Sequence, residues 1–135
     1  MGYPAISDQI TFIYTTNMAA SAEFYEKKLG LTLVLDQGGC RIYRVTSSAY
    51  LGVCQRPADA IQPPDPGRRS VILTIVTPEV DQWYSHLREQ GVTFETEPRD
   101  SAEYKIRHAF LRDPNGYLFE IQRFADPDWR GAEDP

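Results

Sequence analysis

The chain lacks the short motifs that assign many enzymes at once. Its 135 residues contain no G-x-S-x-G nucleophile motif, no G-x-G-x-x-G dinucleotide fingerprint and no Walker-type phosphate loop. The glycine pair Gly38-Gly39 is isolated and is typical of a hairpin turn. The sequence therefore gives no support to a serine hydrolase, a dinucleotide-dependent dehydrogenase or a P-loop NTPase.

Positive charge and long apolar runs are also scarce. Fourteen Lys and Arg residues stand against nineteen Asp and Glu residues, which gives a net charge of -5. That balance argues against a nucleic-acid partner, which needs a basic surface, and favours a neutral or cationic ligand. No run of 18 apolar residues occurs, and the N-terminus lacks the order of a secretion signal. We therefore expect no membrane partner and a cytoplasmic location.

The chain has only two cysteines, Cys40 and Cys54. Two are too few for a disulfide framework, and in a reducing compartment we expect both to be small buried hydrophobes. Neither has a histidine nearby in the sequence that would indicate a nucleophilic pair. What is present is an ordinary globular composition, with 41% hydrophobic and 24% charged residues.

The first half of the chain predicts a strand, a helix and three further strands. Asn17 is a suitable helix cap, apolar residues recur after it at helical spacing, and Gly30 stands where the helix would end. Runs rich in β-branched and aromatic residues predict the strands. The predicted elements are strands at 9–16, 31–35, 40–46 and 49–56 and a helix at 18–29.

The second half predicts the same order after a proline-rich linker at 57–69. Its helix follows Pro78 and ends before Gly91. The last two strands form a hairpin, because the sequence from Asp113 to Gly116 presets a tight turn. We expect the tail to be loose and to dock through Trp129. The predicted elements are strands at 71–77, 92–95, 105–112 and 117–124 and a helix at 79–90.

The two halves repeat one another. A shift of 61 residues (78 minus 17) places Asn17 on Pro78, and a shift of 67 (117 minus 50) aligns AYLGVCQR with GYLFEIQR. We therefore predict one domain, 1–135, built from two modules. An α+β domain whose halves are similar by chance is the alternative. The predicted parts are a first module at about 8–56, the linker, a second module at about 70–124 and a tail at 125–135.

The repeat predicts an α+β fold of tandem βαβββ modules. Each helix would cover the apolar back of its four-stranded sheet, so the other face would stay open or meet a second layer. Two such sheets placed edge to edge would form a curved eight-stranded mixed sheet with the helices on its convex side. A small ligand would bind in the concave groove.

The tandem modules, the opening TTNMAASAEFYEKKLG and the closing RDPNGYLFEIQ resemble the vicinal oxygen chelate superfamily over about residues 8–124. This superfamily holds glyoxalase I, extradiol dioxygenases, fosfomycin resistance enzymes and bleomycin resistance proteins. The resemblance implies paired modules, a homodimer and a ligand in the concave groove. In catalytic members it implies a divalent metal held by His, Glu or Gln residues from the first and last strands of each module.

Most of the positions that hold the metal ion in catalytic members of the superfamily correspond to apolar residues in this chain. The last-strand position of the second module falls on Glu120, and the shift of 67 gives Val53 in the first. The first-strand positions fall on Ile10 and Val71. A metal ion needs three or four N, O or S donors, so we expect no metal cofactor. A slip of one residue would replace Ile10 by Gln9, which leaves Gln9 and Glu120 as weak metal candidates.

Glu120 stands among apolar residues, where an unpaired charge is costly to bury. It is either a ligand-binding or basic group at the floor of the groove, or a relic held by an internal partner such as Arg107. Strand alternation puts Leu118, Glu120 and Gln122 on one face. Of Arg107 and His108 only one shares that face, and we favour Arg107. The predicted ligand-binding residues are Glu120, Gln122, Arg107, Gln55, Val53 and Tyr14.

Two functional hypotheses follow. The first is a metal-free binding protein of the bleomycin resistance type, a homodimer that holds a small cationic or aromatic molecule in its groove. The second is a metal-dependent lyase, isomerase or dioxygenase of the glyoxalase or extradiol type, with Glu120 as a metal ligand. The sequence leaves open the ligand, the presence of catalysis and the dimer geometry.

Overall fold

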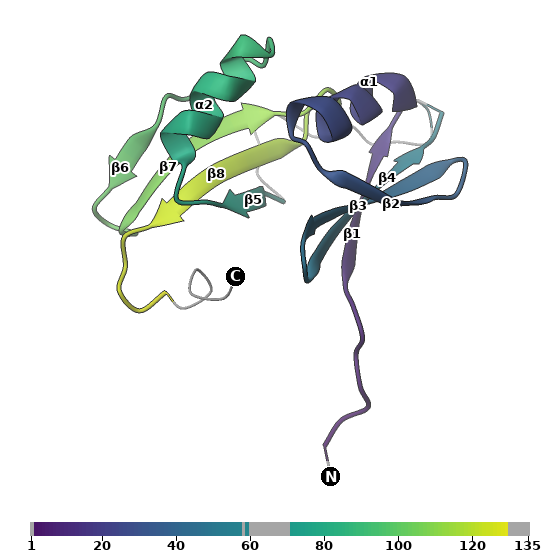
Figure 1. Cartoon of the computed structure of the whole chain (residues 1–135), viewed down its shortest axis with the longest axis horizontal. Helices are drawn as coiled ribbons and strands as arrows, with labels where there is room; N and C mark the ends of the chain where they lie inside the picture. The colour runs from purple at the N-terminus through teal and green to yellow at the C-terminus, as the bar shows by residue number, and fades with distance from the viewer. Residues whose placement is uncertain (1, 58, 60–70, 130–135) are drawn as a thin grey trace. The chain divides into compact units, whose positions relative to one another are not determined.

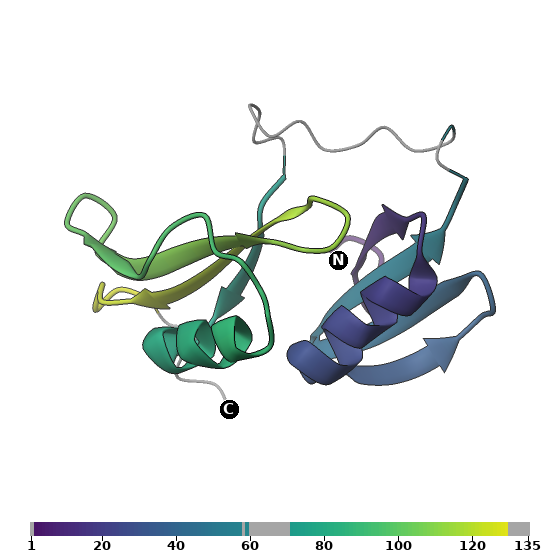
Figure 2. The ribbon, with the colours of Figure 1, turned by 90° about the horizontal axis from the view of Figure 1, so that it is seen from above.

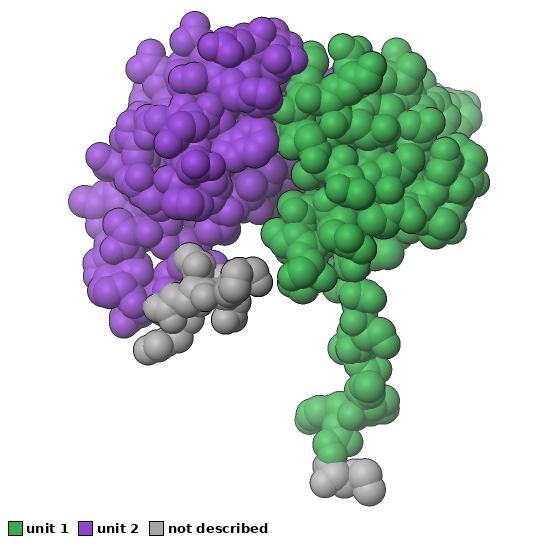
Figure 3. All heavy atoms as spheres, viewed as in Figure 1, with its two compact units in different colours: residues 1–63 green, residues 64–135 purple. Residues whose placement is uncertain are grey.

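The computed structural model describes residues 2–57, 59 and 71–129 (Figure 1). Most of the predicted linker and the end of the predicted tail lie outside the described residues. The chain divides into two compact units, residues 1–63 and residues 64–135 (Figure 3). Each unit contains a strand, a helix and three further strands in that order. The chain is therefore an α+β protein with two four-stranded mixed sheets, as the sequence predicts.

The first sheet has the strand order β1-β4-β3-β2. Its β1 and β4 are parallel, and the other neighbours are antiparallel. The helical segment between β1 and β2 lies across one face of this sheet (Figures 1 and 2). The elements are β1 (Ile10–Thr15), α1 (Met18–Ala22), the π-helical segment η1 (Glu23–Lys28), β2 (Thr32–Asp36), β3 (Cys40–Thr46) and β4 (Ala49–Gln55).

The start of α1 is fixed by polar side chains. Asn17 caps the helix, because its Oδ1 accepts a hydrogen bond from the backbone N–H of Ala20 at 3.1 Å. The amide of Gln55 accepts from the N–H of Met18 at 2.8 Å and donates to the carbonyl of Thr16 at 2.7 Å. These bonds satisfy backbone groups that every helix start leaves without partners inside the helix.

The core of the first unit lies between its helix and its sheet. Tyr25 from η1 and Tyr43 from β3 are fully buried, with ring centroids 5.8 Å apart. Glu26 accepts hydrogen bonds from the Tyr43 hydroxyl at 2.8 Å and from Arg41 at 2.9 Å. Burial, followed by the hydrogen bond to Glu26, raises the pKa of Tyr43 to about 12. Arg41 and Tyr43 therefore mark the face of β3 that meets the helix.

The second sheet repeats the topology with the order β5-β8-β7-β6. Here β5 and β8 are parallel, and the other neighbours are antiparallel. Helix α2 lies across one face and buries Val80 and Leu87. The elements are β5 (Leu73–Val76), α2 (Val80–Glu89), β6 (Arg99–Ser101), β7 (Ile106–Arg112) and β8 (Leu118–Phe124).

The predicted strand at 92–95 is wrong. Only Phe94 in this segment forms a bridge, to Leu111, and the edge strand of the sheet is β6 further along the chain. Pro98 explains the displacement, because proline has no N–H for a ladder and regular pairing begins only at the next residue, Arg99. The edge strand therefore lies in the stretch between the predicted strands at 92–95 and 105–112.

The hairpin that joins β7 to β8 is confirmed. Asp113 holds it, since its Oδ1 accepts from the N–H groups of Asn115 at 2.9 Å and Tyr117 at 2.8 Å. Gly116 takes the left-handed backbone conformation, with φ of 90°. After β8 the described part of the tail docks as predicted, because Trp129 stacks on Phe124 with ring centroids 4.2 Å apart.

The two units repeat with a different register from the predicted one. The helix caps Asn17 and Glu79 are 62 residues apart (79 minus 17), whereas the glycines after the helices, Gly30 and Gly91, are 61 apart. The first helical segment is thus one residue longer. Its η1 part accounts for this, because a π-helix forms bonds five residues apart, as from the N–H of Leu29 to the carbonyl of Phe24.

The strands that follow correspond with a shift of 68 (120 minus 52) rather than 67. Phe12 of β1 lies opposite Gly52, and Thr74 of β5 lies opposite Glu120. Gly52, and not Val53, therefore corresponds to Glu120. The predicted alignment was one residue short because it maximised identity, and a slip of one residue transfers every side chain of a strand to the other face.

The cysteines differ from their prediction. Cys40 and Cys54 are cross-strand partners on β3 and β4 and form a disulfide. Their Cα atoms are 4.1 Å apart, because directly opposed residues on antiparallel strands approach this closely when they share no ladder hydrogen bonds. The prediction was based on the number of cysteines alone. It did not use the pairing of the two neighbouring strands, which places Cys40 opposite Cys54.

Candidate functional site

The candidate site lies on the face of the second sheet that does not meet α2, which we call the helix-free face. Arg107 of β7 reaches Asp81 on α2, so the odd-numbered residues of β7 point toward the helix. The even-numbered residues of β7 and their partners on the neighbouring strands point away. This set includes His108, Phe110, Leu118, Glu120, Gln122, Thr74 and Val76.

Glu120 is the centre of this face and makes hydrogen bonds to three side chains. Its Oε2 lies 2.7 Å from Nδ1 of His108, and its Oε1 accepts from the Thr74 hydroxyl at 3.0 Å. The side-chain amide of Gln122 satisfies its hydrogen bonds when its oxygen and nitrogen are exchanged. In that orientation its nitrogen donates to both Glu120 oxygens at 3.0 Å. The three donors come from β7, β5 and β8, so the sheet itself assembles the cluster.

These donors explain how a carboxylate can occupy a strand of buried residues. Glu120 is only 9% exposed, and an isolated charge at such a position would be costly. Hydrogen bonds from His108, Thr74 and Gln122 offset that cost by engaging both oxygens. The sequence analysis left open whether Glu120 binds a ligand or is held by an internal partner. The structure shows that it has an internal partner. That partner is His108 and not Arg107.

His108 is the more accessible member of the pair. Its side chain is 22% exposed, against 12% for the Glu120 side chain. The Nδ1 atom of His108 is 2.7 Å from Oε2 of Glu120, and it is the donor of this bond whenever the carboxylate is ionised, because an ionised carboxylate can only accept. Within the described part of the chain, Nε2 has no hydrogen-bond partner and is not among the buried atoms that lack one. The free ring nitrogen therefore reaches solvent.

An exposed apolar edge borders the cluster. Ile72, which precedes β5, is 39% exposed, and Val76 at the end of β5 is 42% exposed. Thr74 lies between them and is exposed as well as bonded to Glu120. Alternation along the strand places all three on the helix-free face. Exposed aliphatic side chains thus flank Thr74 on the β5 side of the polar cluster.

The structure contradicts the predicted placement of Arg107. Its guanidinium forms two bonds to Asp81, at 2.8 and 2.9 Å, and a third to Asp100 at 3.2 Å. The hydrogen bond from Arg107 holds the pKa of Asp81 below its usual range. Arg107 therefore ties α2 to β7 on the helix side of the sheet, whereas His108 shares the face of Glu120.

Val53 and Gln55 also lie on the helix side, in the first sheet. Val53 is fully buried opposite Ile13 of β1. Gln55 is occupied with the start of α1, as described above. The prediction that these residues share a groove face is wrong for the same reason as the alignment with Glu120. The true counterparts of the helix-free face in the first unit include Gly52 and Cys54.

The remaining predicted residues are placed differently. Gln122 shares the face of Glu120 and contacts it, as the alternation predicts. Tyr14 lies on the side of the first sheet away from α1, is 41% exposed, and has the Arg56 guanidinium 5.5 Å from its ring centroid. Gln9 is exposed before β1 and donates to the hydroxyl of Thr11 at 3.2 Å. The structure brings together only Glu120 and Gln122 of the predicted set.

Counting along the hairpin from its turn finds the residues that the sequence reasoning missed. Arg112 and Leu118 flank the turn as partners, so Phe110 faces Glu120 and His108 faces Gln122. Partners on antiparallel strands share a face, which selects His108 over Arg107 without any use of the repeat. The sequence carried this signal in the hairpin that it predicted most clearly. Thr74 needed the pairing of β5 with β8, which no local pattern specifies.

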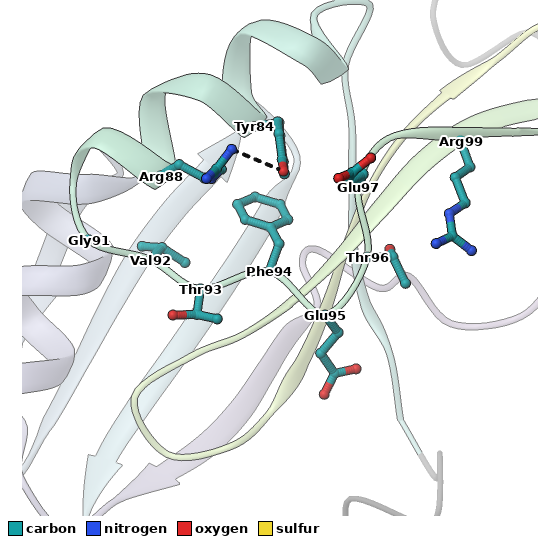
Figure 4. Close-up of a pocket in the computed structure, with 10 residues that line it drawn as sticks. All are labelled: Tyr84, Arg88, Gly91, Val92, Thr93, Phe94, Glu95, Thr96, Glu97 and Arg99. Atoms are coloured by element: carbon teal, nitrogen blue, oxygen red, sulfur yellow. Dashed lines mark hydrogen bonds between the residues drawn. The ribbon is translucent and has the colours of Figure 1, made fainter.

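A separate cavity lies elsewhere in the second unit. It has a volume of about 710 Å³ and is bounded by the second half of α2 and the loop that follows (Figure 4). Tyr84 packs edge-on against Phe94 there, and Arg88 donates to the Tyr84 hydroxyl at 3.3 Å. No residue of the helix-free face lines this cavity. It is therefore separate from the Glu120 cluster.

Comparison with known proteins identifies the family. Residues 7–121 match the model of the Glyoxalase/Bleomycin resistance protein/Dioxygenase superfamily. The chain belongs to this superfamily. Among the described residues, no three His, Cys, Asp or Glu side chains gather as the ligands of a metal ion would. The described residues also contain no helix long and apolar enough to cross a membrane.

The following proteins are similar to this chain at low sequence identity. The uncharacterized protein YraH of Bacillus subtilis (strain 168) is 26% identical over 113 residues, which cover 76% of this chain and 87% of YraH. A glyoxalase/bleomycin resistance protein/dioxygenase from Nocardioides has a TM-score of 0.69 at 24% identity, with 97% and 92% of the two chains covered. TnmS3, an antibiotic binding protein from Streptomyces sp. CB03234, has a TM-score of 0.72 at 22% identity, with 91% and 100% covered. The structural likenesses show the shared fold.

Proposed function

We propose that this superfamily member binds a small organic molecule on the helix-free face of its second sheet and does so without a metal ion. The arrangement around Glu120 is the observation that carries the proposal. Its carboxylate is engaged by three protein donors, and exposed aliphatic side chains stand beside it. A buried polar cluster with an accessible apolar border is the usual composition of a small-molecule site.

The counterparts of this cluster in the first unit support the metal-free part of the proposal. Glu120 corresponds to Gly52, and Thr74 corresponds to Phe12. Glycine and phenylalanine side chains offer no metal ligand, so the first unit supplies no donor from these positions. A divalent ion at Glu120 would also have to displace hydrogen bonds from His108 and Gln122.

The same contacts favour an aromatic ligand over a cationic one. Glu120 is already neutralised in part by its donors, which reduces its attraction for an ammonium group. Ile72 and Val76 instead offer apolar contact area, and His108 offers one unbonded ring nitrogen for a polar group of the ligand. The antibiotic binding protein TnmS3, which shares the fold, provides a precedent for such a use of the scaffold.

We further propose that the protein is a homodimer, which the superfamily resemblance implies for a chain of this length, and that it is cytoplasmic. Light scattering tests the dimer directly, because the monomer has a mass of 15.4 kDa. A mass equal to that of one chain at micromolar concentration would remove the dimer from the account.

A thermal-shift screen with two matched valine variants tests the binding proposal. Ligands that bind the folded state raise its melting temperature, by an amount that corresponds to about 2.7 kcal/mol at a hundredfold excess over Kd. Neutral and cationic aromatic compounds are screened against the unchanged protein. The variant Val76→Asp places a charge on the apolar border, and Val34→Asp does the same at an exposed valine of β2 in the other unit.

The expected result is a set of aromatic compounds that stabilise the unchanged protein and Val34→Asp but not Val76→Asp. Both valines are on edge strands and are similarly exposed, at 42% and 37%, so both substitutions have comparable effects on stability without ligand. Equal ligand-induced shifts in the two variants would place the site away from the helix-free face.

A further inference from the structure

We propose that His108 and Glu120 form a proton-accepting pair that gives this chain a metal-free proton-abstraction activity. The inference rests on the proposed function, because the pair lies on the same helix-free face that would hold the ligand. It names the substrate class as carbonyl compounds, or similarly activated carbon acids, with an acidic C–H bond. His108 would be the catalytic residue, and Glu120 would position it.

The geometry of the pair is that of an oriented base. Glu120 receives the Nδ1–H of His108 at 2.7 Å, which selects one of the two neutral tautomers of the imidazole. That tautomer leaves the lone pair on Nε2, the ring nitrogen that reaches solvent and has no partner among the described residues. A base oriented by a carboxylate through its second nitrogen is the arrangement found in acyl-transfer triads, where the carboxylate stabilises the imidazolium that forms.

The neighbouring residues hold both members of the pair in place. The Thr74 hydroxyl and the Gln122 amide fix the orientation of the Glu120 carboxylate. Phe110, which is buried, packs edge-on against the His108 ring with centroids 5.1 Å apart. Fixed groups lose little freedom when a substrate binds, and this is the condition under which a single base contributes most to a rate.

The four-stranded topology also forms without this pair. The first unit builds the same four-stranded topology with Cys40 where the second has His108 and Gly52 where it has Glu120. An apolar or small residue at these positions is therefore compatible with the architecture. A buried charge that the scaffold does not require, joined to a ring nitrogen that faces solvent, is an arrangement typical of functional sites.

The reaction step balances without any further reagent. The C–H bond of the substrate breaks, and its electron pair stays on the substrate as an enolate or departs with a leaving group. The proton forms a bond to Nε2 of His108. The imidazolium that results is paired with Glu120 at 2.7 Å, so the positive charge is stabilised as it appears. Return of the proton to another carbon gives an isomerisation, and its loss to water completes an elimination.

The first test uses 5-nitrobenzisoxazole, a planar aromatic carbon acid. Removal of its ring C–H proton breaks the N–O bond and releases a coloured cyanonitrophenolate, so turnover is read directly by absorbance. His108→Gln should lose about a hundredfold in rate, since a positioned general base contributes about 10² to 10⁴. His86→Gln, which alters the only other histidine in the chain, should retain the rate of the unchanged protein.

A second measurement separates a base from a merely structural histidine. Long-range ¹H–¹⁵N spectra of the unchanged protein should show His108 as the Nδ1–H tautomer, and Glu120→Gln should reduce the population of this tautomer together with the elimination rate. Melting curves of both variants establish that they are folded. Turnover by His108→Gln within about twofold of the unchanged protein, or no turnover by the unchanged protein, would overturn the proposal.

The two proposals fail in different ways. An unreactive analogue of the probe, 5-nitroindazole, reports binding by thermal shift. Stabilisation by the analogue without turnover of the probe would leave the binding site standing and remove the proton-accepting pair. Absence of both stabilisation and turnover, when other aromatic compounds also fail to bind, would remove the site and the pair together.

Discussion

Glu120 carries a carboxylate within a strand of buried residues, and the neighbouring side chains form hydrogen bonds to it. Its two oxygens are engaged by side chains from three strands. Removing one donor leaves the charge buried and under-satisfied, which generally costs more than a single hydrogen bond contributes. The environment of Glu120 is thus a property of four residues together, with His108 as the member that still has a free polar atom.

In the first unit, the residue that can occupy position 52 also depends on a neighbouring side chain, the ring of Phe12. The aromatic ring of Phe12 lies over Gly52, and a Cβ added there would fall within the contact distance of that ring. We expect Gly52→Ala to lower the free energy of unfolding by about 1–3 kcal/mol, because the ring must leave its position. Urea denaturation of the single variant measures this change.

A double-mutant cycle supplies the control. Phe12→Ala removes the ring, so Gly52→Ala made in that background should cost much less than in the unchanged protein. An equal cost in both backgrounds would show that the glycine is required for its backbone and not for the approach of Phe12. The expectation depends on the pairing of Phe12 with Gly52 across β1 and β4.

Single residues were the hardest part to derive from the sequence. Glu120 was found because a charge among Phe119 and Ile121 is unusual in any strand. The sequence analysis favours Arg107 over His108, and it predicts the wrong face for Val53 and Gln55. These errors share one cause. The face of a strand residue depends on the exact register, and an alignment that is one residue short reverses it.

The secondary-structure elements, by contrast, were largely determined by local patterns. Caps, glycines after helices and the turn from Asp113 to Gly116 are short-range signals, and each of them marks a boundary that the structure confirms within one or two residues. The exceptions required information that is not local. No sequence motif marks the π-helical segment η1, which lengthens the first helical segment by one residue. The edge strand β6 begins after Pro98 and not at the predicted position 92.

The disulfide between β3 and β4 gives a prediction at this scale. Cys40 and Cys54 are 14 residues apart in sequence, and closing a loop of about this length stabilises a folded chain by about 3 kcal/mol in the chain-entropy account. We expect a reducing agent to lower the free energy of unfolding by that order. The double variant Cys40→Ser, Cys54→Ser should be as unstable as the reduced protein and should not respond to the reductant.

Thiol labelling provides the decisive control. The unreduced protein, unfolded in denaturant, should not react with a thiol reagent, because both cysteines are in the disulfide. Labelling of both cysteines without reduction would show that the bridge is absent from the purified protein. The original expectation of free thiols in a reducing compartment would then regain its support.

At the scale of the whole molecule, the two repeated units carry different side chains at equivalent positions of their sheets. Equivalent cross-strand positions hold the Cys40–Cys54 disulfide in the first unit and the His108–Gln122 pair in the second. The superfamily fold is therefore retained in both units, while the polar cluster is confined to one. The sequence predicts the duplicated scaffold and the superfamily, because these depend on the order of elements and on the segments TTNMAASAEFYEKKLG and RDPNGYLFEIQ rather than on register.

Our central proposal is that protein hydrogen bonds, and not a metal ion, hold Glu120. The most direct measurement is the metal content of the protein purified without chelator from a medium supplemented with Zn, Ni, Fe and Mn. We predict well under one ion per chain, and the same value for Glu120→Gln, because the donors around this residue come from His108, Thr74 and Gln122. One ion per chain that is lost in Glu120→Gln would contradict the claim.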